Sequence, residues 1–229
     1  MKKIGIFIPK SNLTVEYELL YLYNKNYFNI DDICFCISKL DFKRNYKEDK
    51  EGYLEDLAND VNNKIVDLDY LNVDYKAFFC TSSAIKYNIS FENPASALIK
   101  IANKKAIKKC LLITPYNEEI GSYISKLLID NNIDVVNEFH LNLLHTNEYF
   151  EFGIDKLEKF ILDNYKEEYG DIVISCTNLP TLRTIENLKD KLNVNIISSN
   201  SSLFEIIKEV SNKWHKKNLK MWLKHVVNN

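Results

Sequence analysis

Short apolar runs that alternate with segments of helical periodicity are the feature that most constrains this chain. Residues 3–9 form the first run, a β-branched stretch that ends in Pro9, and capping residues then introduce a helix expected over 15–24. Six more runs lie at 33–38, 76–80, 110–114, 133–139, 171–175 and 194–198. Further helices are expected over 53–68, 93–106, 115–131, 153–165, 180–192 and from 201 onward. The alternation predicts an α/β fold in which parallel sheets carry helices on both faces, and the continuous apolar runs suit strands covered on both sides.

The second half of the chain repeats the arrangement of the first. In each half a polar turn follows an early strand, Ser11-Asn12 in one and Pro115-Tyr116 in the other. In each half a Cys-Thr pair, Cys80-Thr81 or Cys176-Thr177, follows a later strand. This echo predicts two pseudo-symmetric lobes, each a parallel β-sheet flanked by helices, with a candidate active site in the cleft between them. We place the lobes at residues 1–107 and 108–229, and we expect the last helix to pack back on the first lobe.

Composition excludes several classes of protein. The 229 residues suffice for one large α/β domain or two small ones, and a hydrophobic content of 46% excludes wholesale disorder. A net charge of −2 gives no electrostatic reason to bind nucleic acid or an acidic membrane. No apolar run reaches about 18 residues, so no membrane span is expected, and the opening residues favour a first strand over a signal peptide. We therefore expect a soluble, cytoplasmic protein.

The cysteine pattern favours free thiols. The chain has five cysteines and no Cys-x-x-Cys motif, and an odd number argues against a disulfide framework. Cys34 and Cys36 share one face of a strand, but no motif supplies further metal ligands, so core packing is expected for both and for Cys110. A Walker loop and a G-x-G-x-x-G are also missing from the sequence, so it carries no nucleotide-binding motif.

Cys80 and Cys176 stand at strand ends, which is where ligands bind in open parallel sheets. Each is followed by a polar turn that opens a helix, and the helix dipole is expected to lower the pKa of the thiol. Two thiols that face one carbon can act as base and acid on opposite sides, or one can attack while the other moves a proton. The alternative is that each cysteine is merely a small buried residue at a strand end. Their matching positions in the two halves favour a paired site.

Several short motifs follow one another along nearly the whole chain. They are the opening segment 4–16 with Ser11-Asn12-Leu13-Thr14, the turn Phe79-Cys80-Thr81-Ser82-Ser83, the turn Thr114-Pro115-Tyr116, the segment Ile174-Ser175-Cys176-Thr177-Asn178-Leu179, and Ile197-Ser198-Ser199-Asn200. In this order they resemble the motifs of maleate cis-trans isomerases and their relatives, the arylmalonate decarboxylases, within the aspartate/glutamate racemase superfamily. Each motif is weak alone, and together they are fairly specific.

The resemblance implies a cofactor-free reaction on a small carboxylate substrate, with no metal. Cys80 would be the nucleophile that adds as a thiolate to a cis double bond of the maleate type, and Cys176 would be the acid/base. Ser82 and Ser83 would donate N–H groups to the developing charge. The full set of implied substrate-binding residues is Asn12, Thr81, Ser82, Ser83, Tyr116, Asn147, Thr177 and Asn178. The resemblance also implies a homo-oligomer, either a dimer or a tetramer.

Other reactions remain open for the same two thiols. A racemase acting on an amino acid of the aspartate or glutamate type would use both thiols for proton transfer at Cα. A decarboxylase-like relative is a further alternative, although that family keeps only the second cysteine. The alternative of a different class is a non-catalytic small-molecule-binding domain, whose thiols would alkylate slowly and independently.

Overall fold

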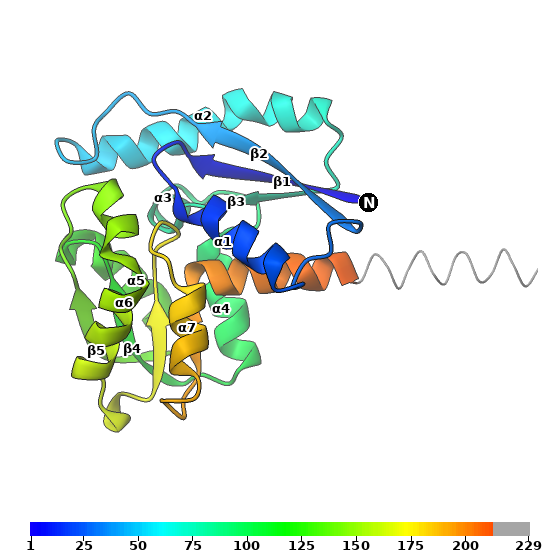
Figure 1. Cartoon of the computed structure of the whole chain (residues 1–229). Coiled ribbons are helices and arrows are strands. Elements are labelled where there is room, and N and C mark those ends of the chain that lie inside the picture. Colours follow the sequence, from blue (N-terminus) through cyan, green and yellow to red (C-terminus); the bar gives the residue numbers. More distant parts are fainter. Residues whose placement is uncertain (213–229) are drawn as a thin grey trace, which may run out of the picture.

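The computed structural model describes residues 1–212, and there the chain forms two parallel β-sheets flanked by helices (Figure 1). The α/β fold with two sheets predicted from the sequence is therefore confirmed. The sheets are formed by consecutive halves of the chain, and the helices connect strand to strand. No helix within residues 1–212 is long and apolar enough to cross a membrane.

The first sheet has the strand order β2-β1-β3, with every pair parallel. Its strands are β1 (Lys2–Pro9), β2 (Ile33–Leu40) and β3 (Tyr75–Phe78), and its helices are α1 (Thr14–Asn24), α2 (Lys50–Tyr70), α3 (Thr81–Tyr87) and α4 (Pro94–Lys104). The central strand β1 is buried from Ile4 to Pro9, because sheet neighbours flank it on both edges and helices cover its faces. Helix α4 begins where the sequence predicts: Asn93 caps it and Pro94 occupies its first turn.

The second sheet has the order β5-β4-β6-β7, again with parallel pairs. Its strands are β4 (Lys109–Thr114), β5 (Asp134–His140), β6 (Asp171–Ile174) and β7 (Ile196–Ser198), and its helices are α5 (Glu118–Asp130), α6 (Thr146–Asn164), the 3-10 turn η1 (Glu167–Tyr169) and α7 (Leu182–Leu188). Residues 199–212 are also helical. Helices α3 and α4 of the first half pack against α5, which joins the two sheets into one body.

The two halves match strand by strand. β1 and β4 are both central strands, and β3 and β6 both lie beside them, with Phe7 paired to Phe78 in one sheet and Ile113 to Ile174 in the other. Cys80 comes two residues after β3, and Cys176 comes two residues after β6. The sequence echo therefore corresponds to a structural repeat that places the two cysteines at equivalent strand ends.

Four elements differ from the sequence-based expectations. The helix expected over 153–165 begins at Thr146, because His145 and Glu148 form a capping box, and Gly153 then breaks the helix with a φ of 74°. The helix expected over 180–192 is confined to α7, and Glu18 accepts the backbone N–H groups of Thr181 and Leu182 at its start. Strands β2 and β5 lie at sheet edges and expose part of their length, so the expected burial on both faces does not hold for these two strands.

The helix at 199–212 returns toward the first sheet (Figure 1). Its Phe204 ring stacks edge-on against Phe28 at 6.2 Å and lies 5.3 Å from the Phe79 ring. Lys104 of α4 forms ion pairs with two of its glutamates. The border between lobes after residue 107 stays a prediction, and residues 213–229 of the predicted second lobe lie outside the described part of the chain.

Candidate active site

The carboxyl ends of the two sheets meet at one small cavity, here called the two-thiol cavity. It is lined by Pro9, Ser11, Asn12, Tyr46, Tyr53, Leu54, Cys80, Ser82, Tyr116, Thr146, Tyr149, Cys176, Thr177 and Asn178. Its volume is about 40 Å³, which is room for a few water molecules. None of these lining residues carries a charge, so neutral groups must hold any ligand bound there.

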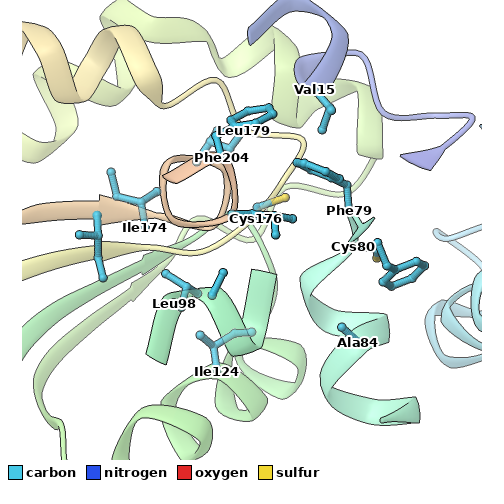
Figure 2. Packing of buried hydrophobic residues seen from close by; sticks show 14 of the residues in the cluster. Val15, Phe79, Cys80, Ala84, Leu98, Ile124, Ile174, Cys176, Leu179 and Phe204 are labelled. Atoms are coloured by element: carbon cyan, nitrogen blue, oxygen red, sulfur yellow. The ribbon is translucent and has the colours of Figure 1, made fainter. Parts of the chain in front are cut away.

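Cys80 lies at the N-cap of the short helix α3 and is buried in the cavity wall. Its Sγ is 4.0 Å from the Ser82 hydroxyl, and the Ser83 backbone N–H points to the same sulfur. Both donors favour the thiolate, but burial outweighs them and raises the pKa of Cys80 to about 11. Figure 2 shows Cys80 beside the buried cluster that includes Phe79.

Cys176 lies at the equivalent turn of the second half and is also buried (Figure 2). The Asn178 backbone N–H donates to its Sγ at 3.3 Å, and the Tyr116 hydroxyl is placed to donate to it as well. Burial nevertheless raises the pKa of Cys176 to about 12. The expectation that a helix N-terminus lowers the pKa of these thiols is therefore wrong for both cysteines, because loss of water around the sulfur outweighs the local donors.

Asn178 joins the two halves of the molecule behind the cavity. Its Oδ1 accepts from the backbone N–H groups of Leu13 and Thr14, at 3.0 and 3.3 Å. Its Nδ2 donates to the carbonyl oxygens of Ser11 and Thr146, at 3.3 and 2.7 Å. All four hydrogen-bonding positions of the amide are thus occupied by protein, which leaves none for a ligand.

Asn12 and Thr177 form a second link between the halves. Asn12 Nδ2 donates to Thr177 Oγ1 at 3.1 Å, and that hydroxyl donates to the Phe79 carbonyl oxygen at 2.9 Å. The Asn12 Oδ1 accepts from the Val15 N–H at 3.1 Å. One N–H of the Asn12 amide remains for a ligand, since the group has two and uses one here.

Three of the residues implied by the family resemblance do not line the two-thiol cavity. The Thr81 hydroxyl bonds to Ser199 at 2.9 Å, and the Ser83 hydroxyl donates to the Leu54 carbonyl oxygen at 2.8 Å. Asn147 is exposed and lines a separate outer recess of about 590 Å³. Seven of the predicted site residues do line the cavity, namely Cys80, Cys176, Asn12, Ser82, Tyr116, Thr177 and Asn178.

Three tyrosines that no sequence motif indicates also line the cavity, and they are here called the tyrosine wall: Tyr46, Tyr53 and Tyr149. Tyr46 packs edge-on against both others, with ring centroids 5.3 Å from Tyr53 and 6.1 Å from Tyr149. Tyr46 comes from the loop before α2, which Arg44 anchors to α2 through Glu55 and Asp56. Because the chain has 14 tyrosines, no local sequence signal separates these three from the rest.

The tyrosine wall stands between the two-thiol cavity and the outer recess. Tyr46, Tyr53, Ser11 and Thr146 line both spaces. The Tyr53 hydroxyl is held by a 2.8 Å hydrogen bond to the Ser11 hydroxyl. The outer recess carries charged side chains such as Arg44, and a ligand that enters from it must therefore pass from charged to neutral surroundings.

A buried carboxylate lies behind the Cys176 turn. Glu18 of α1 is 1% exposed, and one of its oxygens accepts from the backbone N–H groups of Thr181 and Leu182 at 2.6 and 2.8 Å. The other oxygen accepts from Asn200 Nδ2 at 2.6 Å, and Asn200 also donates to the Thr177 carbonyl oxygen. Burial raises the pKa of Glu18 to about 7 in spite of these donors.

The other described thiols lie away from the cavity. Cys110 is buried within β4, in agreement with core packing, whereas Cys34 is exposed and Cys36 half-buried on the edge strand β2. Core packing is therefore wrong for Cys34. Within residues 1–212 no group of three or more His, Cys, Asp or Glu side chains is arranged to hold a metal ion.

Comparison with known proteins supports the resemblance seen in the motifs. No family model matches the chain. The maleate isomerase of Geobacillus stearothermophilus is 21% identical over 235 residues, which covers 92% of both chains. Among solved structures, the chain matches a cysteine-to-serine mutant of the Nocardia farcinica maleate cis-trans isomerase at a TM-score of 0.80 and 14% identity, over 93% of both chains. That structure contains a covalently bound succinylcysteine intermediate.

A double mutant of arylmalonate decarboxylase in its liganded form matches at a TM-score of 0.75 and 15% identity, covering 92% of this chain and 93% of that one. At these identities the structural matches show the fold, and the near-complete coverage shows that both lobes share it. The chain thus resembles the maleate isomerases and arylmalonate decarboxylases over nearly its whole length and has their two-lobed fold.

Proposed function

We propose that this protein is a cofactor-independent cis-trans isomerase of a small unsaturated dicarboxylate, of the maleate-to-fumarate type. The observation that carries the proposal is the pair of buried thiols, Cys80 and Cys176, at equivalent strand ends of one cavity. Two solitary structural cysteines would have no reason to share one cavity. The similarity to maleate isomerases over nearly the whole chain supports the same reaction.

In the proposed reaction Cys80 attacks and Cys176 moves the proton. The Cys80 sulfur forms a bond to one carbon of the double bond, and the electron pair of that bond moves toward the neighbouring carbon and its carboxylate. Cys176 gives a proton to this carbon, and the proton released by Cys80 restores the Cys176 thiol. The net result is addition of the Cys80 S–H across the double bond.

The former double bond is now a carbon–carbon single bond, and rotation about it precedes the reverse step. The Cys176 thiol first gives up its proton and, as a thiolate, removes a proton from the carbon. The carbon–sulfur bond breaks, the double bond re-forms in the trans geometry, and the Cys80 thiolate that leaves takes up the proton that Cys176 released. Both thiols end as they began, so no oxidant, reductant or cofactor is consumed. Tyr116 and the Asn178 N–H donate to Cys176 and stabilise its thiolate form during these steps.

The high pKa of the thiols sets the energetic demand on the site. With a pKa of about 11, Cys80 is a thiolate in only about one molecule in 10⁴ at pH 7. Forming that thiolate costs about 5 kcal/mol, which the reaction must recover by stabilising the intermediate. Asn12 retains one free N–H in the cavity, and we propose it as a substrate-binding group. The Tyr116 hydroxyl has a single proton, and we propose that it donates this proton to the substrate carboxylate while Cys176 is a thiol and to Cys176 while it is a thiolate.

The remaining residues of the predicted site receive other roles in this proposal. Ser83 directs its backbone N–H at Cys80, and Ser82 its hydroxyl, so both would act on the nucleophile. Thr177 and Asn178 would position the Cys176 turn, because their side chains are used in links between the halves. These assignments make the two thiols the only groups that bond to the substrate or exchange protons with its carbons.

The test is turnover of maleate followed by NMR in deuterated buffer. The wild-type protein is compared with Cys80→Ala, Cys176→Ala and the control Cys110→Ala, which removes a buried thiol outside the cavity. We expect fumarate to form with the wild type and the control, and not with either cavity variant.

Each other outcome has a definite meaning. Absence of fumarate from the wild type, with slow and independent alkylation of both thiols, would favour the binding domain. Exchange of the Cα proton of an amino acid for deuterium, without maleate turnover, would favour the two-cysteine racemase. Turnover that persists without Cys80 would contradict the assigned nucleophile.

A further inference from the structure

The hydroxyl group of Tyr149 is a buried phenol of the tyrosine wall, and it faces the hydroxyl group of Tyr46. Tyr149 is 3% exposed and lines the two-thiol cavity, and its hydroxyl makes no hydrogen bond of standard geometry to any residue in the described range 1–212. It lies near enough to the Tyr46 hydroxyl for each phenol to influence the pKa of the other. Buried hydroxyls are normally paired, so this one calls for a partner from outside the protein.

The surroundings of Tyr149 determine what that partner can be. Two acceptors of residues that line the same cavity already have protein donors, because Asn178 Oδ1 receives two backbone N–H groups and the Thr146 carbonyl oxygen receives Asn178 Nδ2. Burial raises the pKa of both Tyr149 and Tyr46, so both phenols stay protonated at neutral pH and can donate. The partner must therefore bring an acceptor oxygen.

The position of Tyr149 indicates how far the acceptor oxygen of the ligand lies from the thiols. Its ring is 5.9 Å from the ring of Tyr116, whose hydroxyl is placed against Cys176. A ligand that reaches both Cys176 and the Tyr149 hydroxyl is thus a short molecule with an acceptor group beside the reacting carbons. The small volume of the cavity and the aromatic rings around it exclude bulky substituents at that end.

We propose that the hydroxyls of Tyr149 and Tyr46 bind one carboxylate of the substrate and restrict the site to short unbranched diacids. This inference rests on the proposed function, in which a small dicarboxylate is the substrate. It assigns Tyr149 as a specificity-determining residue that the motifs resembling the family do not include. A phenol donates a hydrogen bond to a carboxylate without adding a charge to the cavity, which suits a lining that has none.

The experiment compares two acids that cannot be isomerised and differ at one end. Succinate and butyrate have the same number of carbon atoms, and butyrate has a methyl group where succinate has its second carboxylate. Binding of each is measured by calorimetry to the wild type, to Tyr149→Phe and to Tyr46→Phe. The control is Tyr165→Phe at the end of the same helix α6, where the lost hydroxyl bonds to the Gly170 carbonyl oxygen.

We expect the wild type and the control to prefer succinate over butyrate by at least about tenfold. In Tyr149→Phe the preference should fall by about tenfold, which is the effect of losing one hydrogen bond to a charged group, while butyrate binding stays unchanged. The loss in Tyr46→Phe should be smaller or equal. Equal succinate binding by Tyr149→Phe and wild type, or no preference in the wild type, would overturn the inference.

Maleate turnover, measured in parallel, separates this inference from the proposed function. Turnover with a KM that does not respond to Tyr149→Phe leaves the isomerase and refutes the role of Tyr149. Succinate binding that depends on Tyr149, without any turnover of maleate, refutes the isomerase and leaves a diacid site. If both hold, the KM for maleate should rise about tenfold in Tyr149→Phe with kcat within a few fold of wild type.

Discussion

Glu18 should make the stability of this protein fall as pH rises from acid to neutral. Its carboxyl group is 1% exposed, and burial raises its pKa from the usual 4.5 to about 7. Three N–H donors surround it, from Thr181, Leu182 and Asn200, and these favour the charged form. The prediction is that burial outweighs the donors, so the folded protein binds this proton more tightly than the unfolded chain does.

The sign and size follow from this difference in pKa. Between pH 4.5 and about 7 the folded protein holds the proton while the unfolded chain has released it. The stabilisation is therefore fully present below pH 4.5 and is lost as pH rises through about 7. At about 1.4 kcal/mol for each pKa unit, the loss in the free energy of unfolding is about 3 kcal/mol.

The assay is urea unfolding of the wild type and Glu18→Gln at a series of pH values from 4 to about 8.5. Glutamine keeps an oxygen that can accept from Thr181 and Leu182 but has no proton to release, so the difference between the two proteins isolates the titration of Glu18. We expect wild-type stability relative to the variant to fall by about 3 kcal/mol across this range. Glu158→Gln is the control, because Lys191 lowers the pKa of this partly buried carboxyl and its effect belongs below pH 4.5.

A difference that stays constant with pH would refute the argument that burial dominates at Glu18. If the wild type gains stability relative to the variant as pH rises, the N–H donors outweigh burial, and the carboxylate is the stabilised form of Glu18 in the folded protein. Either result would change the charge assigned to Glu18 behind the Cys176 turn, since Asn200 connects Glu18 to the Thr177 carbonyl oxygen.

Two further predictions concern the thiols and the link between the halves. Iodoacetamide should modify Cys80 and Cys176 slowly at pH 7, because burial raises their pKa to about 11 and 12. The rate should rise about tenfold for each pH unit up to about pH 10, as measured by mass spectrometry. Labelling of either thiol as fast as that of the exposed Cys34 at pH 7 would contradict this prediction. Asn178→Ala should lower the free energy of unfolding by about 2–4 kcal/mol, since four buried or partly buried backbone groups lose their partner. In the same urea titrations the exposed Asn187→Ala should change it by less than about 0.5 kcal/mol. An Asn178→Ala variant as stable as wild type would refute the structural role.

The strands and their ends could be predicted from the sequence because they depend on local patterns. Continuous apolar runs identify β1, β4 and β6, and in parallel sheets the residues just after such strands lie at one edge. The matched Cys-Thr pairs therefore indicated the cavity before the structure did. The strands and the cysteine turns can be predicted because both depend on residues that are neighbours in the sequence.

The tyrosine wall and the thiol pKa values could not be predicted, because both depend on packing between distant segments. Tyr46 comes from a loop, Tyr53 from α2 and Tyr149 from the start of α6, and only the folded chain brings the three together. The start of α6 was itself missed, since a histidine caps it and Gly153 interrupts it. The pKa of each thiol follows burial by both lobes rather than the adjacent helix.

The most direct test of the proposed two-thiol reaction is to trap the covalent intermediate on Cys80. Cys176→Ser is incubated with maleate, and the product is examined by intact mass and peptide mapping. We expect an adduct with the mass of maleic acid on Cys80, formed faster than on the exposed Cys34 and absent from a Cys80→Ala, Cys176→Ser double variant. An adduct on Cys34 alone, or none on Cys80 while the wild type isomerises maleate, would contradict the assignment of Cys80 as the nucleophile.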